Sequence, residues 1–226
     1  MITSRDNERL KLVRKLHDRR WRDKLGLFAV EGEDLVEAGL AAGLEPADVL
    51  VVGDDVEAEL LAEVSTLAHP PRVVAVFRRD DLARGARPVT LALWRVGDPG
   101  NVGTLLRAAD AFGAGIALSE GCADPTGPKA VRASMGSLFR VPLSGFDEPP
   151  ARRVALVPSG GTPLPELQSG GDVVLVLGAE REGLPAKILD RCEERVSIPQ
   201  TGGAESLNVA LAGAIALYEL ARAESA

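Results

Sequence analysis

The sequence is short of cysteine, histidine and aromatic residues, and each shortage argues against a class of function. The two cysteines, Cys122 and Cys192, lack metal-ligand spacing, so both are expected to be reduced thiols. His17 and His69 are the only histidines, which argues against a His-rich zinc or iron site, and no metal is predicted. Aromatic residues make up 4% of the chain, so a nucleic acid is not expected to be held mainly by base stacking.

Long apolar runs are also missing. No run reaches the length of a membrane-spanning helix, and residues 1–15, MITSRDNERLKLVRK, lack the apolar centre of a signal peptide. The remaining composition, 46% apolar and 26% charged, is typical of a soluble globular protein. The 226 residues suffice for one large domain or two small ones. We therefore expect a cytoplasmic protein.

The net charge of −7 argues against nucleic acid at first sight, but the charges are unevenly distributed. Residues 1–24 contain nine Lys and Arg against four Asp and Glu, whereas residues 31–63 contain eleven acidic residues and no Lys or Arg. The basic segment is a candidate contact for a phosphate backbone. The cations proposed to make this contact are Arg5, Arg9, Lys11, Arg14 and Lys15. The alternative is a solvated amphipathic helix that balances its own charges.

The first 80 residues alternate between helical and strand patterns, which predicts a small α/β domain over residues 1–80. The helix expected over 6–20 carries an apolar stripe formed by Leu10, Val13 and Leu16. The other expected elements are strands at 27–30, 48–53 and 72–77 and helices at 33–43 and 55–68. A polar stretch with Gly and Pro follows, and within it residues 81–88 are the predicted linker.

The alternation restarts after the linker, which predicts a second domain over residues 89–226. Because helices separate its strands, this domain is expected to be α/β with a mostly parallel sheet. Its strands are expected at 89–94, 115–119, 153–157, 172–178 and 195–198, and its helices at 102–112, 127–137, 184–190 and 205–222. The apolar run from Val173 to Leu177 does not alternate, as expected for a strand covered on both faces.

Three glycine-containing turns follow strands of the second domain, at the sheet edge where parallel sheets bind ligands. Their sequences are DPGNVGTLLRAAD at 98–110, GAEREGL at 178–184 and IPQTGGAESLNVA at 198–210. The first turn is not the G-x-G-x-x-G of dinucleotide-binding proteins, the chain has no G-K-S/T of a Walker loop, and Ser206 has no G-x-S-x-G elbow. These features disfavour a nicotinamide oxidoreductase, a P-loop enzyme and a Ser-His-Asp hydrolase.

The polar residues of these turns have both ordinary and functional interpretations. Arg107 is expected opposite the apolar face of its helix, as a solvated charge or an anion contact. Asn101 could be a helix N-cap, Glu180 an ordinary loop acid and Ser206 a plain residue at a helix start.

Asn208 raises a different question, because it precedes a helix that is apolar nearly all round. Such a helix is expected to be buried on every side, so the Asn208 amide needs a partner, either backbone or ligand. The apolar final helix also suggests a subunit interface, and burial inside the monomer is the competing interpretation.

Together the three turns resemble the three motifs of the SpoU (TrmH) family of RNA ribose 2′-O-methyltransferases, in order and spacing. The matching stretches are DPGNVGTLLRAADAFG, LVLGAEREGL and IPQTGGAESLNVALAGAIALYE. PKAVRASMGSLFRVP at 128–142 resembles the segment between the first two motifs, and the N-terminal stretch is similar to the substrate-binding domain of such enzymes. Gln200 departs from the family, which usually has methionine there; the resemblance implies that Gln200 reshapes the cofactor pocket of this chain slightly and leaves the reacting groups unchanged.

The resemblance implies a fold, a cofactor and a set of site residues. The catalytic domain should contain a deep C-terminal trefoil knot that binds S-adenosyl-L-methionine, largely through the backbone of Gly178, Ile198 and Leu207. The enzymes of the family are homodimers with the site at the interface. The catalytic residues carried over by position are Arg107, Asn101, Glu180, Ser206 and Asn208. Arg107 would dock a substrate phosphate and, as proposed for the family, accept the proton of the ribose hydroxyl.

The substrate implied by the N-terminal domain is ribosomal RNA of the large subunit (23S). The alternatives are transfer RNA, self-protection against a ribosome-binding antibiotic, and a non-catalytic RNA-binding or ribosome-assembly protein of the same fold. The five intact polar residues argue against the non-catalytic alternative. The target nucleotide cannot be read from the sequence.

Overall fold

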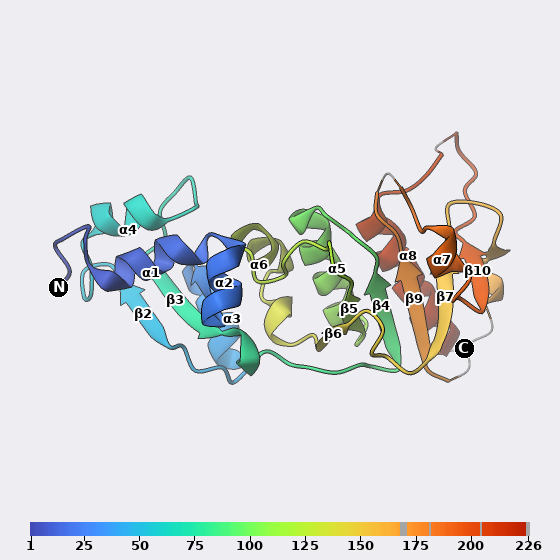
Figure 1. Ribbon diagram of the computed structural model, residues 1–226, viewed down its shortest axis with the longest axis horizontal. Helices are drawn as coiled ribbons and strands as arrows, with labels where there is room; N and C mark the ends of the chain where they lie inside the picture. The colour runs from blue at the N-terminus through green and yellow to red at the C-terminus, as the bar shows by residue number, and fades with distance from the viewer. Residues whose placement is uncertain (168–170, 181, 204, 225–226) are drawn as a thin grey trace. The chain divides into compact units, whose positions relative to one another are not determined.

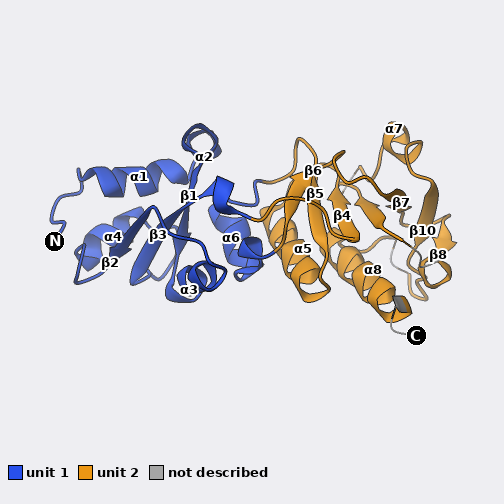
Figure 2. Cartoon of the chain, turned by 90° about the horizontal axis from the view of Figure 1, so that it is seen from below, with its two compact units in different colours: residues 1–82, 124–140 blue, residues 83–123, 141–226 orange. Residues whose placement is uncertain are grey.

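The computed structural model describes residues 1–167, 171–180, 182–203 and 205–224, and the chain divides into two compact units (Figures 1 and 2). Unit 1 comprises Met1–Leu82 and Asp124–Arg140, and unit 2 comprises Ala83–Ala123 and Val141–Ala226. The second domain predicted from the sequence included residues 124–140. In the structure these residues cluster with the N-terminal unit instead.

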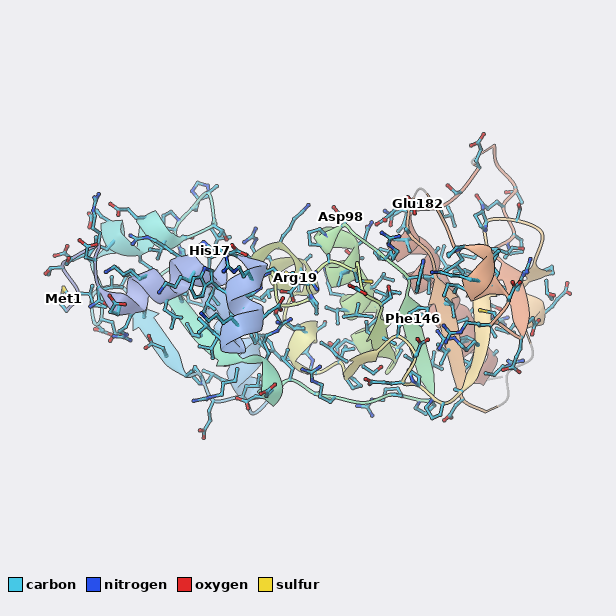
Figure 3. All side chains as sticks on the ribbon, in the orientation of Figure 1. Met1, His17, Arg19, Asp98, Phe146 and Glu182 are labelled. Atoms are coloured by element: carbon cyan, nitrogen blue, oxygen red, sulfur yellow. The ribbon has the colours of Figure 1, made fainter. Side chains whose placement is uncertain are left out.

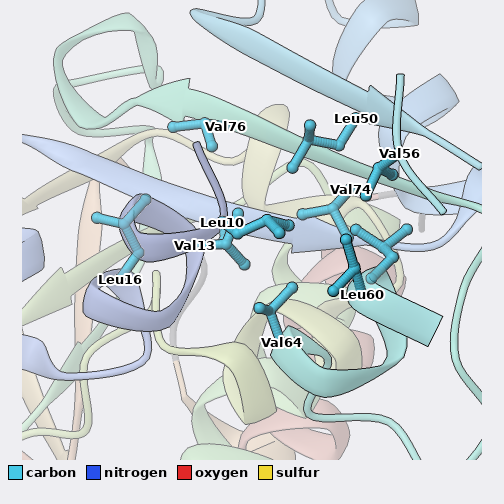
Figure 4. Close-up of a cluster of buried hydrophobic side chains, with 11 residues drawn as sticks. Leu10, Val13, Leu16, Leu50, Val56, Leu60, Val64, Val74 and Val76 are labelled. Carbon is cyan, nitrogen blue, oxygen red and sulfur yellow. The ribbon is translucent and has the colours of Figure 1, made fainter. Parts of the chain in front are cut away.

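Unit 1 is built on a three-stranded antiparallel sheet in the order β1-β3-β2. Its strands are β1 (Leu27–Glu31), β2 (Asp48–Val51) and β3 (Val73–Arg78), and its first four helices are α1 (Glu8–Leu16), α2 (Arg19–Leu25), α3 (Glu33–Ala41) and α4 (Ala58–Val64). The predicted stripe of α1 is buried: Leu10, Val13 and Leu16 pack in one cluster with apolar side chains of α4, β2 and β3 (Figure 4). Burial of this stripe fixes α1 on the sheet.

The single helix predicted over 6–20 is wrong, because the chain forms two helices there. The Asp18 side chain accepts a hydrogen bond from the Arg20 backbone N–H at 2.8 Å and caps α2. Asp18 has extended backbone angles, as N-cap residues do, so α1 cannot continue through it. The break turns the basic segment into a corner between α1 and α2.

The segment 124–140 is fixed to unit 1 by a buried carboxylate. Asp124 accepts hydrogen bonds from Arg22 Nε at 2.8 Å, from Arg79 Nη2 at 3.0 Å and from the Thr126 hydroxyl at 2.7 Å. Burial raises the pKa of the Asp124 carboxyl, but the hydrogen bonds from Thr126 and Arg22 and the charge of Arg79 outweigh burial and lower the pKa. The segment continues through α6 (Pro128–Ser134) and stacks Phe139 near the β1 and β3 phenylalanines.

Unit 2 is an α/β unit around a seven-stranded sheet in the order β6-β5-β4-β9-β7-β10-β8, with every neighbouring pair parallel. This confirms the predicted fold class. The strands are β4 (Val89–Leu93), β5 (Gly115–Leu118), β6 (Leu143–Gly145), β7 (Arg152–Leu156), β8 (Thr162–Pro163), β9 (Val173–Leu177) and β10 (Glu194–Ser197). β6 and β8 were not predicted, because they are too short to show a pattern. All five residues of β9 are buried, as predicted.

Two helices, α5 (Pro99–Ala111) and α8 (Val209–Glu224), pack side by side against the sheet (Figure 2). Their approach is close, because a Cβ on Gly213 of α8 would collide with the Leu105 side chain of α5. The short α7 (Ala186–Leu189) contributes Ile188 to a separate cluster with Phe146 and residues of β4, β5 and β9.

The final helix differs from the prediction in its start and in its burial. It begins at Val209 instead of 205, and one face of it is open: Leu211, Ile215 and Tyr218 are 57%, 41% and 57% exposed. The expectation that it is buried on every side is therefore wrong for the single chain. In the part of the chain that is described, no helix combines the length and apolar character needed to cross a membrane.

Candidate active site

The three motif turns meet at the carboxyl edge of the unit 2 sheet. The central strands β4 and β9 pair in register, with Leu93 opposite Leu177, so the turns that follow them emerge side by side. Asp98 at the start of α5 and Glu182 after β9 project from this edge (Figure 3). The third turn follows β10 and leads into α8. Parallel strands therefore collect segments that lie 79 to 107 residues apart in the sequence.

Asn101 joins the three turns by hydrogen bonds. Its Nδ2 donates to Glu180 Oε1 at 2.7 Å, and its Oδ1 accepts from Asn208 Nδ2 at 3.1 Å. Because the amide nitrogen donates and the amide oxygen accepts, these bonds fix the orientation of the Asn101 side chain. Asn101 is not the helix N-cap: Asp98 takes that place by accepting the Asn101 backbone N–H at 3.0 Å.

Asn208 has the partners that its position demanded. Its Oδ1 accepts the backbone N–H groups of Ala210 at 2.9 Å and Leu211 at 3.2 Å, which caps the first turn of α8. Its Nδ2 is left to donate to Asn101. The backbone alternative weighed for this amide is thus observed, together with a side-chain contact that the sequence did not reveal.

A cavity of about 420 Å³ lies between the second and third turns. The three residues expected to contact a cofactor, Gly178, Ile198 and Leu207, all line it, and so do Glu180 and Ser206. Its other walls are mainly apolar: Leu156, Val157, Pro158, Leu177, Ala179, Glu182, Gly183, Leu184, Leu189, Gln200, Val209 and Ala212. Its volume falls within the range of small-molecule sites, about 300–1,000 Å³.

Gly178 allows the second turn to fold back over the end of β9. A Cβ on Gly178 would lie 2.7 Å from the Leu184 nitrogen and would also collide with the Gly183 carbonyl group. The Gly183 N–H donates to the Ala179 carbonyl at 2.9 Å and closes the turn. The close approach expected at Gly178 is therefore made first of all by the chain's own backbone, which shapes the cavity wall.

A second cleft, of about 540 Å³, adjoins the first and shares Ala179, Glu180 and Glu182 with it. Asn101 lines this cleft, so the Asn101–Glu180 hydrogen bond lies where the two spaces meet. Its remaining lining residues are Arg95, Gly97, Asp98 and Gly121.

Arg95 was missed in the sequence analysis. It has a left-handed backbone (φ 53°) that is uncommon outside glycine, and its N–H donates to Ser119 Oγ at 2.8 Å. Its position two residues after the end of β4 was the available signal.

Arg107 lies apart from both spaces. It is exposed on the side of α5 opposite the buried Val102, Leu105 and Leu106, as its spacing predicted. It lines neither cavity, and within residues 1–167, 171–180, 182–203 and 205–224 it has no ion-pair partner. Of the five predicted polar residues, the structure joins Asn101, Glu180 and Asn208 by hydrogen bonds. It places Ser206 in the cavity beside them and leaves Arg107 outside.

Most cations of the basic N-terminal segment are paired with acidic residues of unit 1. Arg5 pairs with Glu63 at 2.8 Å, and Arg14 lies 3.6 Å from the same carboxylate. Arg9 forms a forked pair with Asp48, with Nη2 to Oδ1 at 2.6 Å. Lys11 pairs with Glu8 at 3.0 Å. Four of the five proposed cations therefore have acidic partners, but only Lys11 is paired within its own helix, as the alternative of a self-balanced helix expected. The carboxylates named above for the other three belong to β2 and α4, and Lys15 forms no ion pair with the residues that the structure describes.

Comparison with known proteins identifies both parts of the chain. Residues 88–218 match the model of the SpoU rRNA Methylase family. The chain belongs to this SpoU family. Residues 7–78 match the MRM3-like substrate binding domain. Among the described residues, no group of three or more His, Cys, Asp and Glu side chains could hold a metal ion.

The SpoU relatives include characterised enzymes. The chain is 31% identical to the 23S rRNA (guanosine(2553)-2′-O)-methyltransferase RlmP of Bacillus subtilis, over 97% of this chain and 98% of RlmP. It resembles the structure of an AdoMet-bound rRNA methyltransferase from Sinorhizobium meliloti, with a TM-score of 0.88, 30% identity and 98% and 97% coverage of the two chains. It also resembles the AdoMet complex of AviRb from Streptomyces viridochromogenes, with a TM-score of 0.87 and 27% identity over 97% of this chain and 99% of AviRb.

Proposed function

We propose that this SpoU protein transfers a methyl group from S-adenosyl-L-methionine to a ribose 2′-hydroxyl of 23S ribosomal RNA, in the cytoplasm. The observation that carries the proposal is the hydrogen-bonded group Glu180–Asn101–Asn208, which joins the three family motifs beside a cavity of cofactor size. The alternative is a non-catalytic protein of the same fold, and the presence of all five motif residues, Asn101, Arg107, Glu180, Ser206 and Asn208, argues against it.

Coverage of the relatives favours ribosomal over transfer RNA. RlmP, named for 23S rRNA, aligns along 97% of this chain, including the N-terminal unit. A structure titled for 2-OH methylation of C/U34 on tRNA covers only 62% of this chain, with a TM-score of 0.57. The match to RlmP extends over the region that fits the substrate binding domain, residues 7–78, and this supports a ribosomal substrate.

The cavity residues fit S-adenosyl-L-methionine. The apolar walls of the cavity suit an adenine ring. The folded-back turn at Gly178 brings backbone groups to the edge of the cavity, and Glu180 adds a carboxylate there. Gly178, Ile198 and Leu207 would hold the cofactor. When bound, the cofactor supplies a methyl group on a sulfonium, which is a good leaving group, so the protein must mainly position and deprotonate the hydroxyl.

The polar residues divide this work. Asn101 and Asn208 orient the reacting groups, Glu180 holds the second turn against α5, and Ser206 lies in the cavity where it can contact the substrate. A guanidinium remains protonated in proteins, so Arg107 is assigned first to docking a substrate phosphate. Removal of the hydroxyl proton is the more demanding role for Arg107, because a protonated guanidinium has no site to accept a proton.

We also infer a homodimer through unit 2 and a trefoil knot within it. The exposed apolar stripe Leu211, Ile215 and Tyr218 is continuous with Phe112, whose ring lies 6.4 Å from that of Tyr218. Such a patch favours a subunit interface. A site at this interface would explain why Arg107 lines neither cavity of one chain. The insertion of β9 between β4 and β7 supports the knotted topology.

Substitution of Gly178 should weaken cofactor binding. Gly178→Ala forces the 183–184 backbone away from β9, and a cost of about 1–3 kcal/mol for overpacking corresponds to a loss of S-adenosyl-L-methionine affinity between about fivefold and about 150-fold. Isothermal calorimetry measures it. Gly202→Ala is the matched control, because no atom lies within 4 Å of its added Cβ. Equal affinities for the two variants would refute the placement of the cofactor.

Substitution of Arg107 should separate chemistry from cofactor binding. Arg107→Ala is expected to lower the rate of methyl transfer to a 23S rRNA transcript by about 100-fold or more while cofactor affinity stays unchanged. Arg107→Lys should rescue poorly, because a point charge replaces a planar fork. Transfer of tritium from labelled cofactor is the readout. Arg87→Ala, at another exposed arginine of unit 2, should stay within about twofold of wild type. Normal turnover of Arg107→Ala contradicts the assignment.

Charges on the stripe of α8 should dissociate the dimer. The double variant Leu211→Glu/Tyr218→Glu is expected to sediment as a monomer, since two carboxylates would be buried without partners. Leu40→Glu is the control, because Leu40 is 49% exposed on α3 of unit 1. A wild-type protein that sediments as a monomer, or a double variant that remains dimeric, excludes this interface.

A further inference from the structure

The corner between α1 and α2 carries cations that have no acidic partner, unlike the rest of the basic segment. His17 and Arg19 mark this corner in Figure 3. Lys15, Arg20 and Lys24 are exposed, and none forms an ion pair with a carboxylate of the described residues. The two neighbouring acids are engaged elsewhere: Asp18 caps α2, and Asp23 lies 3.7 Å from Arg19 and also pairs with Arg79.

Trp21 lies at the centre of this group. The Nζ atoms of Lys15 and Lys24 lie 5.3 Å and 5.0 Å from its ring centroid, in cation–π geometry. The ring is partly exposed. The other tryptophan, Trp94, packs against Phe146 in unit 2 at 5.3 Å between centroids and has one lysine, Lys187, 5.3 Å from its ring centroid. Trp21 differs from Trp94 in having two lysines over its ring and no aromatic neighbour among the described ring contacts.

We propose that Lys15, Arg20, Trp21 and Lys24, hereafter the Trp21 surface, bind an unpaired stretch of the RNA substrate, with one base stacked on the Trp21 ring. The inference rests on the proposed function and refines where unit 1 contacts RNA. The proposal is based on the contact that each cation must break before it can bind a phosphate. Arg5, Arg9, Lys11 and Arg14 must leave a carboxylate to meet a phosphate, whereas Lys15 and Lys24 leave only the face of a ring.

Replacement of a lysine ammonium by a base at the Trp21 ring creates two favourable contacts. A base that stacks on Trp21 displaces an ammonium, and that ammonium then lies next to the phosphate that the nucleotide carries. Stacking on an aromatic side chain is stronger than an exposed cation–π contact, and every base offers a π-face. Bases inside an A-form duplex are already stacked, so the Trp21 surface selects loops, bulges or single strands. A single stacking residue is consistent with the aromatic content of 4%, because stacking then adds to charge contacts and is not the main source of affinity.

Tryptophan fluorescence tests the stacking directly. In a full-length Trp94→Phe variant, Trp21 is the only tryptophan. An oligouridylate of about 12 nucleotides, a length within the usual range for single-strand sites, should quench its emission, and a blunt RNA duplex at equal phosphate concentration should quench far less. Equal quenching by the two probes, or none by either, overturns the proposal.

Two double variants with the same loss of charge test the electrostatic part. Lys15→Ala/Lys24→Ala should make the slope of log affinity against log salt shallower by about 1.4, which is two phosphate contacts of a single strand. Arg5→Ala/Arg14→Ala removes two paired cations from the same segment and should leave the slope nearly unchanged. Substitutions are used instead of removal of residues 1–82, because residues 124–140 pack within unit 1. Equal slopes for the two variants overturn the proposal.

The methylation assay separates this inference from the proposed function. Trp21→Ala should raise the apparent KM for 23S rRNA between about fivefold and about a hundredfold with kcat and cofactor affinity unchanged, and Trp21→Phe should restore most of it. If oligouridylate quenches the emission of the Trp94→Phe variant but the wild-type protein transfers no methyl group, the proposed function is defeated and the Trp21 surface is supported. Full activity of Trp21→Ala at limiting rRNA defeats the Trp21 surface alone.

Discussion

The arrangement of the site depends on the two hydrogen bonds made by the side-chain amide of Asn101. This side chain bonds to both other motif segments, donating to Glu180 after β9 and accepting from Asn208 at the start of α8. Because Asn208 also caps α8, the position of that helix and the orientation of Asn101 are coupled. Because Glu180 lines both the cofactor-sized cavity and the adjoining cleft, the same bond fixes the border between the two spaces.

Much of this could be predicted from the sequence, since it depends on local periodicity and on turn chemistry. The exposure of Arg107 follows from its spacing against Val102, Leu105 and Leu106, and the burial of β9 follows from its unbroken apolar run. The edge of a parallel sheet where ligands bind also follows from the alternation of strands and helices. The expected roles of the motif residues came from the resemblance of the three turns to the SpoU family, because hydrophobic periodicity gives no information about chemistry.

The rest depends on contacts between distant residues, which one sequence does not show. The attachment of residues 124–140 to unit 1 depends on Asp124 meeting Arg22, 102 positions away. The neutralised N-terminal cations depend on carboxylates such as Asp48 and Glu63 that fold against α1. The break at Asp18 was readable in principle, because aspartate is a common N-cap, but the apolar stripe masked it. The open face of α8 reflects what a single chain leaves uncovered.

We infer that Asn101 and Glu180 act as one unit in methyl transfer. A double-mutant cycle tests this coupling, with Asn101→Ala, Glu180→Ala and the double variant compared by the single-turnover rate of methyl transfer to 23S rRNA at saturating cofactor. If the two side chains act together, the rate falls in the double variant by much less than the product of the two single losses, with a coupling of about 0.5–3 kcal/mol. Losses that multiply, so that the two side chains act independently, would contradict it.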